Sequence, residues 1–407
     1  MAVNTPSALS NIRVLEIALG VNTPYAGTVL GEFGAEVIKI EQRAGDPGRT
    51  NTTWAGVRQD LAPGRTCIYE HTNTNKRGMT INLKHPKGKE VFHRLIERSD
   101  VFLNAYRPRT AKSLGVDYET LSKLNPRLIY GVSSAYGQQG PDGGVAGFDY
   151  TGMARSGFMF TIGTPEMPPM TSSGVIVDTM GATLLALGVL VALEAREQTG
   201  IGQRVDSSLL LGGMQLARFD IYTALNIGEQ YERFDRKRAH NALWNYYQCK
   251  DDEWLMLAMP FPDPFWPKVC DILGIPDLGR DPRYLTFEQR FDHREVLVTA
   301  LDQAFLKRDR KEWLGLLKEA DCSFSTVAHI ADLSKDEQAT ANGYVFQYDH
   351  PSLGKMWAAG PPAKLSRTPA TFRIPAPLLG EHNKEVLTQV CGYSEKDAEE
   401  LQRVGAV

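Results

Sequence analysis

The sequence predicts an α/β fold: a doubly wound parallel sheet in a large domain, followed by a smaller α+β domain. Short apolar segments with strand character alternate with helical segments through the first half of the chain, which is typical of βαβ units. After about Gly228 the alternation ends, and aromatic residues and prolines cluster instead. With 407 residues the chain is too long for one core and suits about two or three domains.

The first predicted unit is a strand at 12–17, a helix at 25–33 and a strand at 35–40, with Gly34 capping the helix. Further strands are predicted at 80–83, 101–103, 128–133 and 204–206. Further helices are predicted at 86–98, 118–124, 148–157, 209–225 and 383–391. Because strands joined through helices run parallel, we expect one sheet with helices on both faces, of the nucleotide-binding type.

We expect three regions along the chain. Residues 1–225 form the large domain, which contains Asp178, and residues 226–335 form the small α+β domain. Residues 336–407 form a linker and a C-terminal segment that returns to the large domain. No internal repeat suggests another organisation.

The composition narrows the class of function. The net charge is −3, from 45 basic and 48 acidic residues, which gives no support to a nucleic-acid or membrane-surface role. The longest apolar run, Met180 to Leu193, is shorter than the ~20 residues that span a bilayer. The 5 cysteines are scattered and lack CxxC spacing. We therefore expect no disulfide framework, no metal site and a cytoplasmic location.

A single carboxylate, Asp178, stands where the chain enters a long helix that continues to Arg196. The helix is apolar on every face, so we expect it to be buried. Free amides and the positive end of the helix dipole hold a carboxylate ionised at such a place. Asp178 is then either a helix cap or a partly desolvated nucleophile toward an activated carbonyl. This segment alone favours the cap.

Cations recur at loop positions near predicted strand ends of the large domain, where they would suit the phosphates of a nucleotide ligand. They are Arg43, Arg49, Arg107 and Arg109, together with Lys76 and Arg77 in an amide-rich loop that also holds Asn73 and Asn75. Each one alone is better explained as a solvated surface charge, and only their recurrence at strand ends of one domain favours a binding role. The chain lacks a GxGxxG motif after the first strand, a P-loop, a GxSxG elbow and HExxH spacing.

Several motifs together resemble those of the class III CoA-transferases, over nearly the whole chain. They are Val14-Leu15-Glu16-Ile17, Pro24-Tyr25-Ala26-Gly27, the segment Leu30 to Glu41, Gly45-Asp46-Pro47, Asn75-Lys76-Arg77, Asn125-Pro126-Arg127-Leu128-Ile129-Tyr130, Ser134-Ala135-Tyr136-Gly137-Gln138 and Leu378-Leu379-Gly380-Glu381-His382. The family's nucleophile is an aspartate at the start of a long helix, and that position matches Asp178, with Gly181 following.

The resemblance implies transfer of CoA from an acyl-CoA donor to a free carboxylic acid, bulky, aryl or dicarboxylic, through aspartyl anhydride and aspartyl-CoA thioester intermediates. It implies coenzyme A as a substrate, no tightly bound cofactor, and an interlocked homodimer or a heteromer with a related subunit. The residues expected to bind coenzyme A are Arg43, Lys76, Arg77, Arg107, Tyr106 and Tyr136.

Two alternatives remain open. Racemases of 2-methylacyl-CoA thioesters resemble this chain too, but they carry histidine where Phe148 stands and glutamate where Asn245 stands. The second alternative is a non-catalytic subunit of a heteromeric transferase. The chain also departs from the formyl-CoA transferase pattern, with Val21 in place of a glutamine and no glycine in the segment Lys237 to Asn241. These departures weaken an expectation of formyl-CoA or oxalate as substrate.

Overall fold

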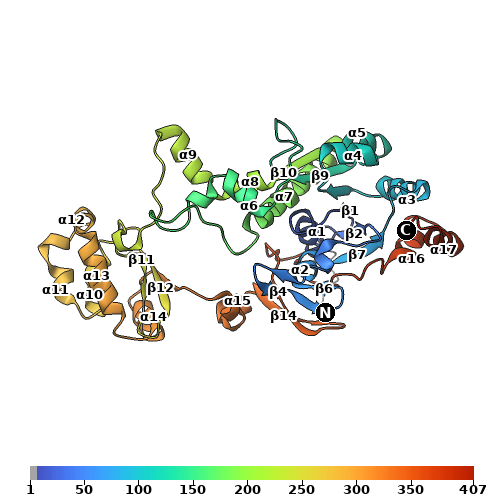
Figure 1. Cartoon of the computed structure of the whole chain (residues 1–407). Helices are drawn as coiled ribbons and strands as arrows, with labels where there is room; N and C mark the ends of the chain where they lie inside the picture. The colour runs from blue at the N-terminus through green and yellow to red at the C-terminus, as the bar shows by residue number, and fades with distance from the viewer. Residues whose placement is uncertain (1–6) are drawn as a thin grey trace. The chain divides into compact units, whose positions relative to one another are not determined.

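The computed structural model describes residues 7–407, so the first six residues of the predicted large domain lie outside it. The chain forms two compact units (Figure 1). The first comprises the residues up to Thr161, then Thr171–Gln230 and Tyr344–Val407. The second comprises Ile162–Met170 and Tyr231–Gly343. The chain thus enters the second unit twice and rejoins the first at Tyr344, a few residues after the predicted return at 336.

The first unit is built on a six-stranded sheet with the order β10-β9-β8-β1-β2-β7, and every pair of neighbouring strands is parallel. The strands are β1 (Arg13–Ile17), β2 (Glu36–Glu41), β7 (Lys76–Thr80), β8 (Val101–Asn104), β9 (Ile129–Ser134) and β10 (Arg204–Ser208). The order runs outward from β1 in both directions, which is the doubly wound arrangement. It leaves a crevice where the loops after β1 and β8 diverge.

Successive strand residues face opposite sides of this sheet. On one side, Val14 packs with residues of α1 (Asn22–Glu32) and α7 (Ile176–Thr199). On the other side, Leu15 packs with residues of α3, α4, α5 and the C-terminal helices. Those helices are α3 (Pro86–Glu97), α4 (Pro108–Leu114), α5 (Tyr118–Leu124), α16 (Asn383–Glu385), a π-helical stretch at Val386–Val390, and α17 (Glu395–Arg403). Strands that are buried on both faces explain the apolar segments of the sequence.

The expectation that the long helix is buried on every face is wrong. α7 packs against α1, the sheet and α8 (Leu209–Leu216) on one side, whereas Leu187 and Val191 are more than half exposed. Its length and apolar composition would also suit a membrane span. Only 44% of its most apolar 18-residue window is buried, so the exposed stripe needs a separate explanation.

Several local predictions shift in the structure. The strand predicted at 80–83 lies earlier, at Lys76–Thr80, because its charged side chains are neutralised by partners far away in sequence. The helix predicted at 209–225 divides at Ala217 into α8 and α9 (Arg218–Ile227). Two helices that the pattern did not reveal are α2 (Cys67–Asn73) and α4.

Three small hairpins complete the first unit. They are β3 (Thr53–Trp54) with β4 (Val57–Arg58), β5 (Asp60–Ala62) with β6 (Arg65–Thr66), and β14 (Val345–His350) with β15 (Gly354–Ala359). The first two hairpins are inserted between β2 and α2, so the chain carries extra backbone next to the carboxyl end of β2.

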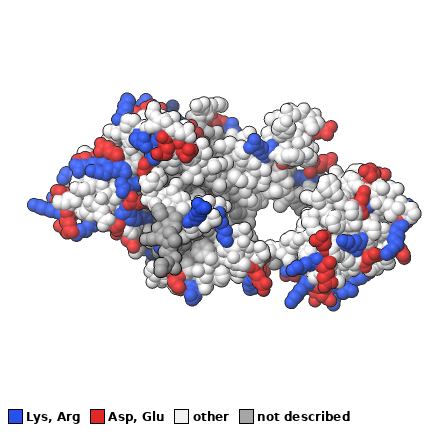
Figure 2. All heavy atoms as spheres, turned by 180° about the vertical axis from the view of Figure 1, so that it is seen from behind, with Lys and Arg blue, Asp and Glu red and all other residues white. Residues whose placement is uncertain are grey.

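The second unit is an α+β module. Its antiparallel sheet has the order β11-β12-β13, with β11 (Trp244–Gln248), β12 (Trp254–Ala258) and β13 (Phe324–Thr326). Its helices are α10 (Trp266–Ile272), α11 (Pro276–Arg280), α12 (Phe287–Asp292), α13 (Arg294–Phe305), α14 (Arg310–Glu319) and α15 (Glu337–Ala341). Trp266 lies in its core, whereas Trp244 and Phe261 are exposed. On the face shown in Figure 2, cations and carboxylates are interspersed.

Candidate active site

A cavity of about 350 Å³ lies at the crevice of the parallel sheet, beside Asp178. Its walls come from Leu19–Thr23 after β1, Ala105–Arg107 after β8, Ser133–Ala135 at the end of β9, Gly143 and Val145–Phe148, together with Leu209. This is the place where a doubly wound sheet binds ligands, because the loops after β1 and β8 leave in opposite directions. We call it the Asp178 cavity.

Asp178 is the third residue of α7 and lines this cavity as a half-buried side chain. It does not cap the helix. The N-cap position is Val175, whose side chain makes no capping bond. The interpretation of Asp178 as a helix cap is therefore wrong, and its carboxylate is left for another role.

The cap of α7 is instead Asp149, the first residue of α6 (Asp149–Arg155). One carboxylate oxygen of Asp149 accepts hydrogen bonds from the amides of Val177 and Asp178, each at 2.9 Å. Asp149 is only 4% exposed, and its second oxygen has no hydrogen-bond partner. Asp149 lies at the start of the helix predicted at 148–157, but the helix that it caps lies almost thirty residues further along the chain.

The two carboxylates raise the basicity of the site. Burial, and then the charge of Asp149, raise the pKa of Asp178 to about 7. Since the first-turn amides of α7 are occupied by Asp149, they do not stabilise the Asp178 carboxylate as the sequence suggests. With this pKa the carboxylate is partly ionised at neutral pH, and its ionised form is more nucleophilic than an ordinary carboxylate.

Asn22 fixes the other side of the helix start. Its side-chain amide donates to the backbone oxygen of Asp178 at 2.8 Å, and its own side-chain oxygen is buried without a partner. A Cβ at Gly181 would lie 2.7 Å from the Asn22 amide nitrogen, so glycine leaves room for this contact. The amide of Gly181 lies inside the helix, where the backbone hydrogen-bond ladder uses it. It is therefore not a free donor for an oxyanion.

Three predicted binding residues gather at the same cavity. Arg107 and Tyr106 line it directly. Arg107 is exposed, and no carboxylate between residues 7 and 407 forms an ion pair with it. Tyr136 lies next to the lining residue Gly147, and the guanidinium of Arg155 stacks 4.7 Å from the centre of its ring. All three follow the carboxyl end of a strand, as a ligand site of this fold requires.

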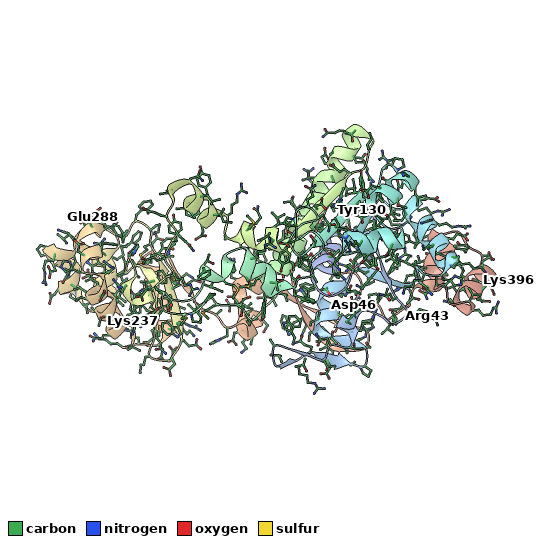
Figure 3. All side chains as sticks on the ribbon, turned by 45° about the horizontal axis from the view of Figure 1, so that its top comes forward. Arg43, Asp46, Tyr130, Lys237, Glu288 and Lys396 are labelled. Carbon is green, nitrogen blue, oxygen red and sulfur yellow. The ribbon has the colours of Figure 1, made fainter. Side chains whose placement is uncertain are left out.

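The other three are placed differently. Arg43 is exposed in the loop after β2, which also carries Asp46 (Figure 3), and its guanidinium lies close to Gly405. Lys76 is fully buried, where its ammonium group donates to Glu16 at 2.8 Å. Burial lowers the pKa of Lys76 to about 8.

Arg77 pairs with Glu36 and, at 2.7 Å, with Glu385. Lys76 and Arg77 open β7 instead of following a strand, so neither offers a free cation at the carboxyl edge of the sheet. Their positions do not support the prediction that they contact coenzyme A.

A second cavity, of about 290 Å³, shares the residue Val21 with the first. Its lining is mainly apolar and comes from the inserted hairpins, α2 and the segment just before Asp178. The lining residues are Val21, Trp54, Gln59, Cys67, Ile68, His71, Thr72, Ser173, Gly174 and Val175. No lysine or arginine is among them. We call it the Trp54 cavity.

The two positions relevant to racemase chemistry hold no proton-transfer group. Phe148 lines the Asp178 cavity and is 80% exposed. Asn245 is fully buried in the second unit, where its amide donates to the backbone oxygen of Arg236 at 2.9 Å. A phenyl ring cannot transfer a proton, and the amide of Asn245 is occupied in a structural bond.

Comparisons with known proteins show the family of the chain. The model of CoA-transferase family III matches residues 9–383. The chain is 32% identical to cinnamoyl-CoA:phenyllactate CoA-transferase of Clostridium sporogenes, over 98% of this chain and 97% of the relative. It is also 32% identical to (R)-2-hydroxy-4-methylpentanoate CoA-transferase of Clostridioides difficile, over 95% of this chain and 96% of the relative.

The fold matches solved structures as well. A CAIB/BAIF family protein from Brucella suis superposes with a TM-score of 0.85 at 24% identity, covering 95% of this chain and 100% of that chain. Since the family model covers most of the chain and its relatives align from end to end, the chain belongs to CoA-transferase family III and is an enzyme of that class.

Proposed function

We propose that this enzyme moves CoA from an acyl-CoA donor to a free carboxylic acid, with Asp178 as the nucleophile. The observation that carries the proposal is the unpaired carboxylate of Asp178, with its raised pKa, in the cavity at the sheet crevice. Arg107 supplies a free cation at the same cavity for the phosphates of coenzyme A, which enters as a substrate.

The chemistry needs no net proton transfer. The Asp178 carboxylate attacks the donor thioester carbonyl, the carbon–sulfur bond breaks, and an acyl-aspartyl anhydride and CoA thiolate form. The thiolate then attacks the Asp178 carbonyl carbon and releases the donor acid, leaving an aspartyl-CoA thioester. The acceptor carboxylate displaces the thiolate to form a second anhydride. Attack of the thiolate on the acceptor carbonyl gives the new acyl-CoA and frees Asp178.

The Trp54 cavity is the proposed place for the acyl group. It adjoins the Asp178 cavity at Val21 and ends at Val175, one helical turn before Asp178. Its apolar lining favours an aryl or branched acid. A dicarboxylic acid would place its second carboxylate against a wall without a lysine or arginine, at a cost in desolvation. Relatives of similar identity are named for aryl and branched acids and for dicarboxylic acids, so the lining alone carries this choice.

Assembly with a second copy, or with a related subunit, is part of the proposal. The outer face of α7 and all of α9 expose apolar side chains, including Leu187, Val191, Tyr222, Leu225 and Ile227. An exposed apolar surface of this extent favours a protein partner. The 5 cysteines are all free, which fits the proposed cytoplasmic location.

The test uses the purified full-length chain, an acyl-CoA donor and hydroxylamine. Hydroxylamine should convert the anhydride or thioester at Asp178 into a hydroxamate that peptide mass spectrometry locates. Asp178→Ala should lose transfer by at least about a thousandfold and give no hydroxamate, while Glu288→Gln, an exposed control, should behave as the wild type. Hydroxamate at another residue, or transfer by Asp178→Ala, would contradict the proposal.

The same mixture distinguishes the alternatives. A non-catalytic subunit would show neither transfer nor a hydroxamate when assayed alone. A racemase would exchange the α-proton of a 2-methylacyl-CoA in D₂O. Because Phe148 and Asn245 provide no acid or base, we expect the α-position to stay protonated.

A further inference from the structure

A third cavity, of about 230 Å³, lies between helices α1 and α2 and the hairpin β14–β15. It shares no lining residue with the Asp178 cavity. We call it the hairpin cavity. Its lining combines several aromatic rings with two carboxylates that each have a buried oxygen without a hydrogen bond.

The aromatic side chains surround the cavity. They are Tyr25, Phe346, Tyr348, Trp357 and Phe372. The rings of Tyr348 and Phe372 have their centres 4.1 Å apart, and Tyr25 stacks on His71 at 5.3 Å. Aromatic faces carry partial negative charge, so a group of them attracts a cation and repels an anion.

Glu32 contributes the first carboxylate. It is the last residue of α1, where the negative end of the helix dipole disfavours a negative charge. One of its carboxylate oxygens is buried and has no hydrogen-bond partner. Burial raises the pKa of Glu32 to about 7, and burial together with the Glu32 charge raises the pKa of Tyr25. A carboxylate in this position is unfavourable by itself and is stabilised by a cation placed in the cavity.

Glu70 contributes the second carboxylate and is only 4% exposed. One of its oxygens accepts a hydrogen bond from Arg65 at 2.5 Å. The other oxygen is buried without a hydrogen bond, although the Nε2 atom of His350 lies 3.5 Å away. No lysine or arginine lines the cavity, and since Arg65 balances the charge of Glu70, Glu32 is the lining carboxylate without an ion pair.

The chemistry of the lining decides what kind of cation fits. Metal ions such as Ca²⁺ require about six to eight oxygen ligands, and no group of three or more His, Cys, Asp or Glu residues in the described part of the chain could hold a metal. The volume is below that of a drug-sized pocket, which starts at about 300 Å³. A compact cation with apolar substituents satisfies both the carboxylates and the aromatic rings.

We propose that the hairpin cavity binds the ammonium group of a small organic cation, with Glu32 and Glu70 facing its charge and the aromatic rings around its alkyl groups. Cys67 and His71 also line the Trp54 cavity, but occupation of the hairpin cavity does not require Asp178 to react.

Choline is a suitable probe, because replacing its nitrogen by carbon gives a neutral alcohol of the same shape. Calorimetric titration of the full-length protein with choline should show saturable binding, and the neutral isostere should bind at least about tenfold more weakly. Equal binding of the two compounds, or no choline binding at millimolar concentration, would overturn the proposal.

Two variants locate the site. Glu32→Gln should weaken choline binding by at least about tenfold, whereas Glu288→Gln, on an exposed helix of the second unit, should leave it unchanged. Trp357→Leu removes one aromatic face from a half-exposed position of the hairpin, so folding is preserved, and it should weaken binding about three- to tenfold. Unchanged binding in both Glu32→Gln and Trp357→Leu would show that choline binds elsewhere and would refute the assignment.

Discussion

Glu16 and Asp178 are both withdrawn from water in the first unit, yet their surroundings differ. Glu16 lies on β1, fully buried, and pairs with Lys76 at 2.8 Å and with Lys39 at 3.4 Å. Asp178 pairs with no lysine or arginine between residues 7 and 407, and its charged neighbour is another carboxylate, Asp149. Burial with a cation fixes a carboxylate as a structural element, whereas burial without one leaves it basic and available for chemistry.

The paired carboxylate also serves the unpaired one. Lys39 donates to the backbone oxygen of Ala18 at 2.9 Å, and Lys76 donates to that of Pro24 at 2.6 Å. Ala18 begins the loop after β1, and Pro24 lies in the first turn of α1, which follows that loop. The loop lines the Asp178 cavity, so Glu16 holds two cations that fix the chain on both sides of it. The buried ion pairs of Glu16 therefore help to shape the cavity in which Asp178 lies.

The largest effect on stability is expected from breaking the buried ion pair between Glu16 and Lys76. Lys76→Met leaves the Glu16 charge buried with only the longer Lys39 contact, and should lower the free energy of unfolding by about 3–5 kcal/mol. Urea unfolding measures this change. Lys396→Met, at an exposed position of α17, should change it by less than about 0.5 kcal/mol. Adding Glu16→Gln to Lys76→Met should restore part of the loss, and no restoration would argue against the pairing.

Removing the unpaired charge of Asp178 should instead raise the free energy of unfolding. The pKa of Asp178 is raised in the folded protein, so the folded state binds the proton more tightly than the unfolded state. Ionisation therefore costs stability as the pH rises from about 4 through 7. Asp178→Asn should be more stable than the wild type by about 1–2 kcal/mol at pH 8 and equally stable near pH 4, because the side chain is partly exposed. A stabilisation that persists at low pH would have another cause.

The same contrast between paired and unpaired groups applies to the cations. Arg107→Gln should raise KM for the acyl-CoA about tenfold with little change in kcat, because a phosphate contact stabilises ground and transition states alike. Arg109→Gln, two residues further along in α4 and outside the cavity lining, is the matched control. Arg77→Gln should also leave KM unchanged, since its partners are Glu36 and Glu385. A KM effect in Arg77→Gln but not in Arg107→Gln would reverse this assignment.

The smallest effect, a shift in the pH dependence of kcat, is expected from changing Asp149, the charged neighbour of Asp178. Asp149→Asn retains an oxygen that can accept from the amides of Val177 and Asp178 but removes the negative charge. The pKa of Asp178 should fall, and the pH at which kcat reaches half its maximum should move down by about half to one unit. Asp149→Ala loses the cap as well and should be about 1 kcal/mol less stable. An upward or absent pH shift in Asp149→Asn would show that Asp149 does not act through its charge.

Local sequence was sufficient for part of this site. The alternation of apolar segments predicted the parallel sheet, since period and spacing are properties of short stretches. The position of Asp178 at a helix start, and of Arg107, Tyr106 and Tyr136 after strands, follows from the same pattern. Asp149 lies at the start of the helix predicted at 148–157, but the local sequence gave no sign of which helix it caps, because Val177 lies 28 residues away.

What the sequence by itself determined is therefore the order of the strands and helices, the family, and the candidate nucleophile. Only the tertiary structure decided which charges are neutralised. Lys76 and Glu16 are 60 residues apart, and Arg77 and Glu385 are 308 apart, so their pairing could not be seen in any local pattern. The physical reason is that burial and ion pairing depend on which elements pack together, whereas strand and helix signals depend on neighbours along the chain.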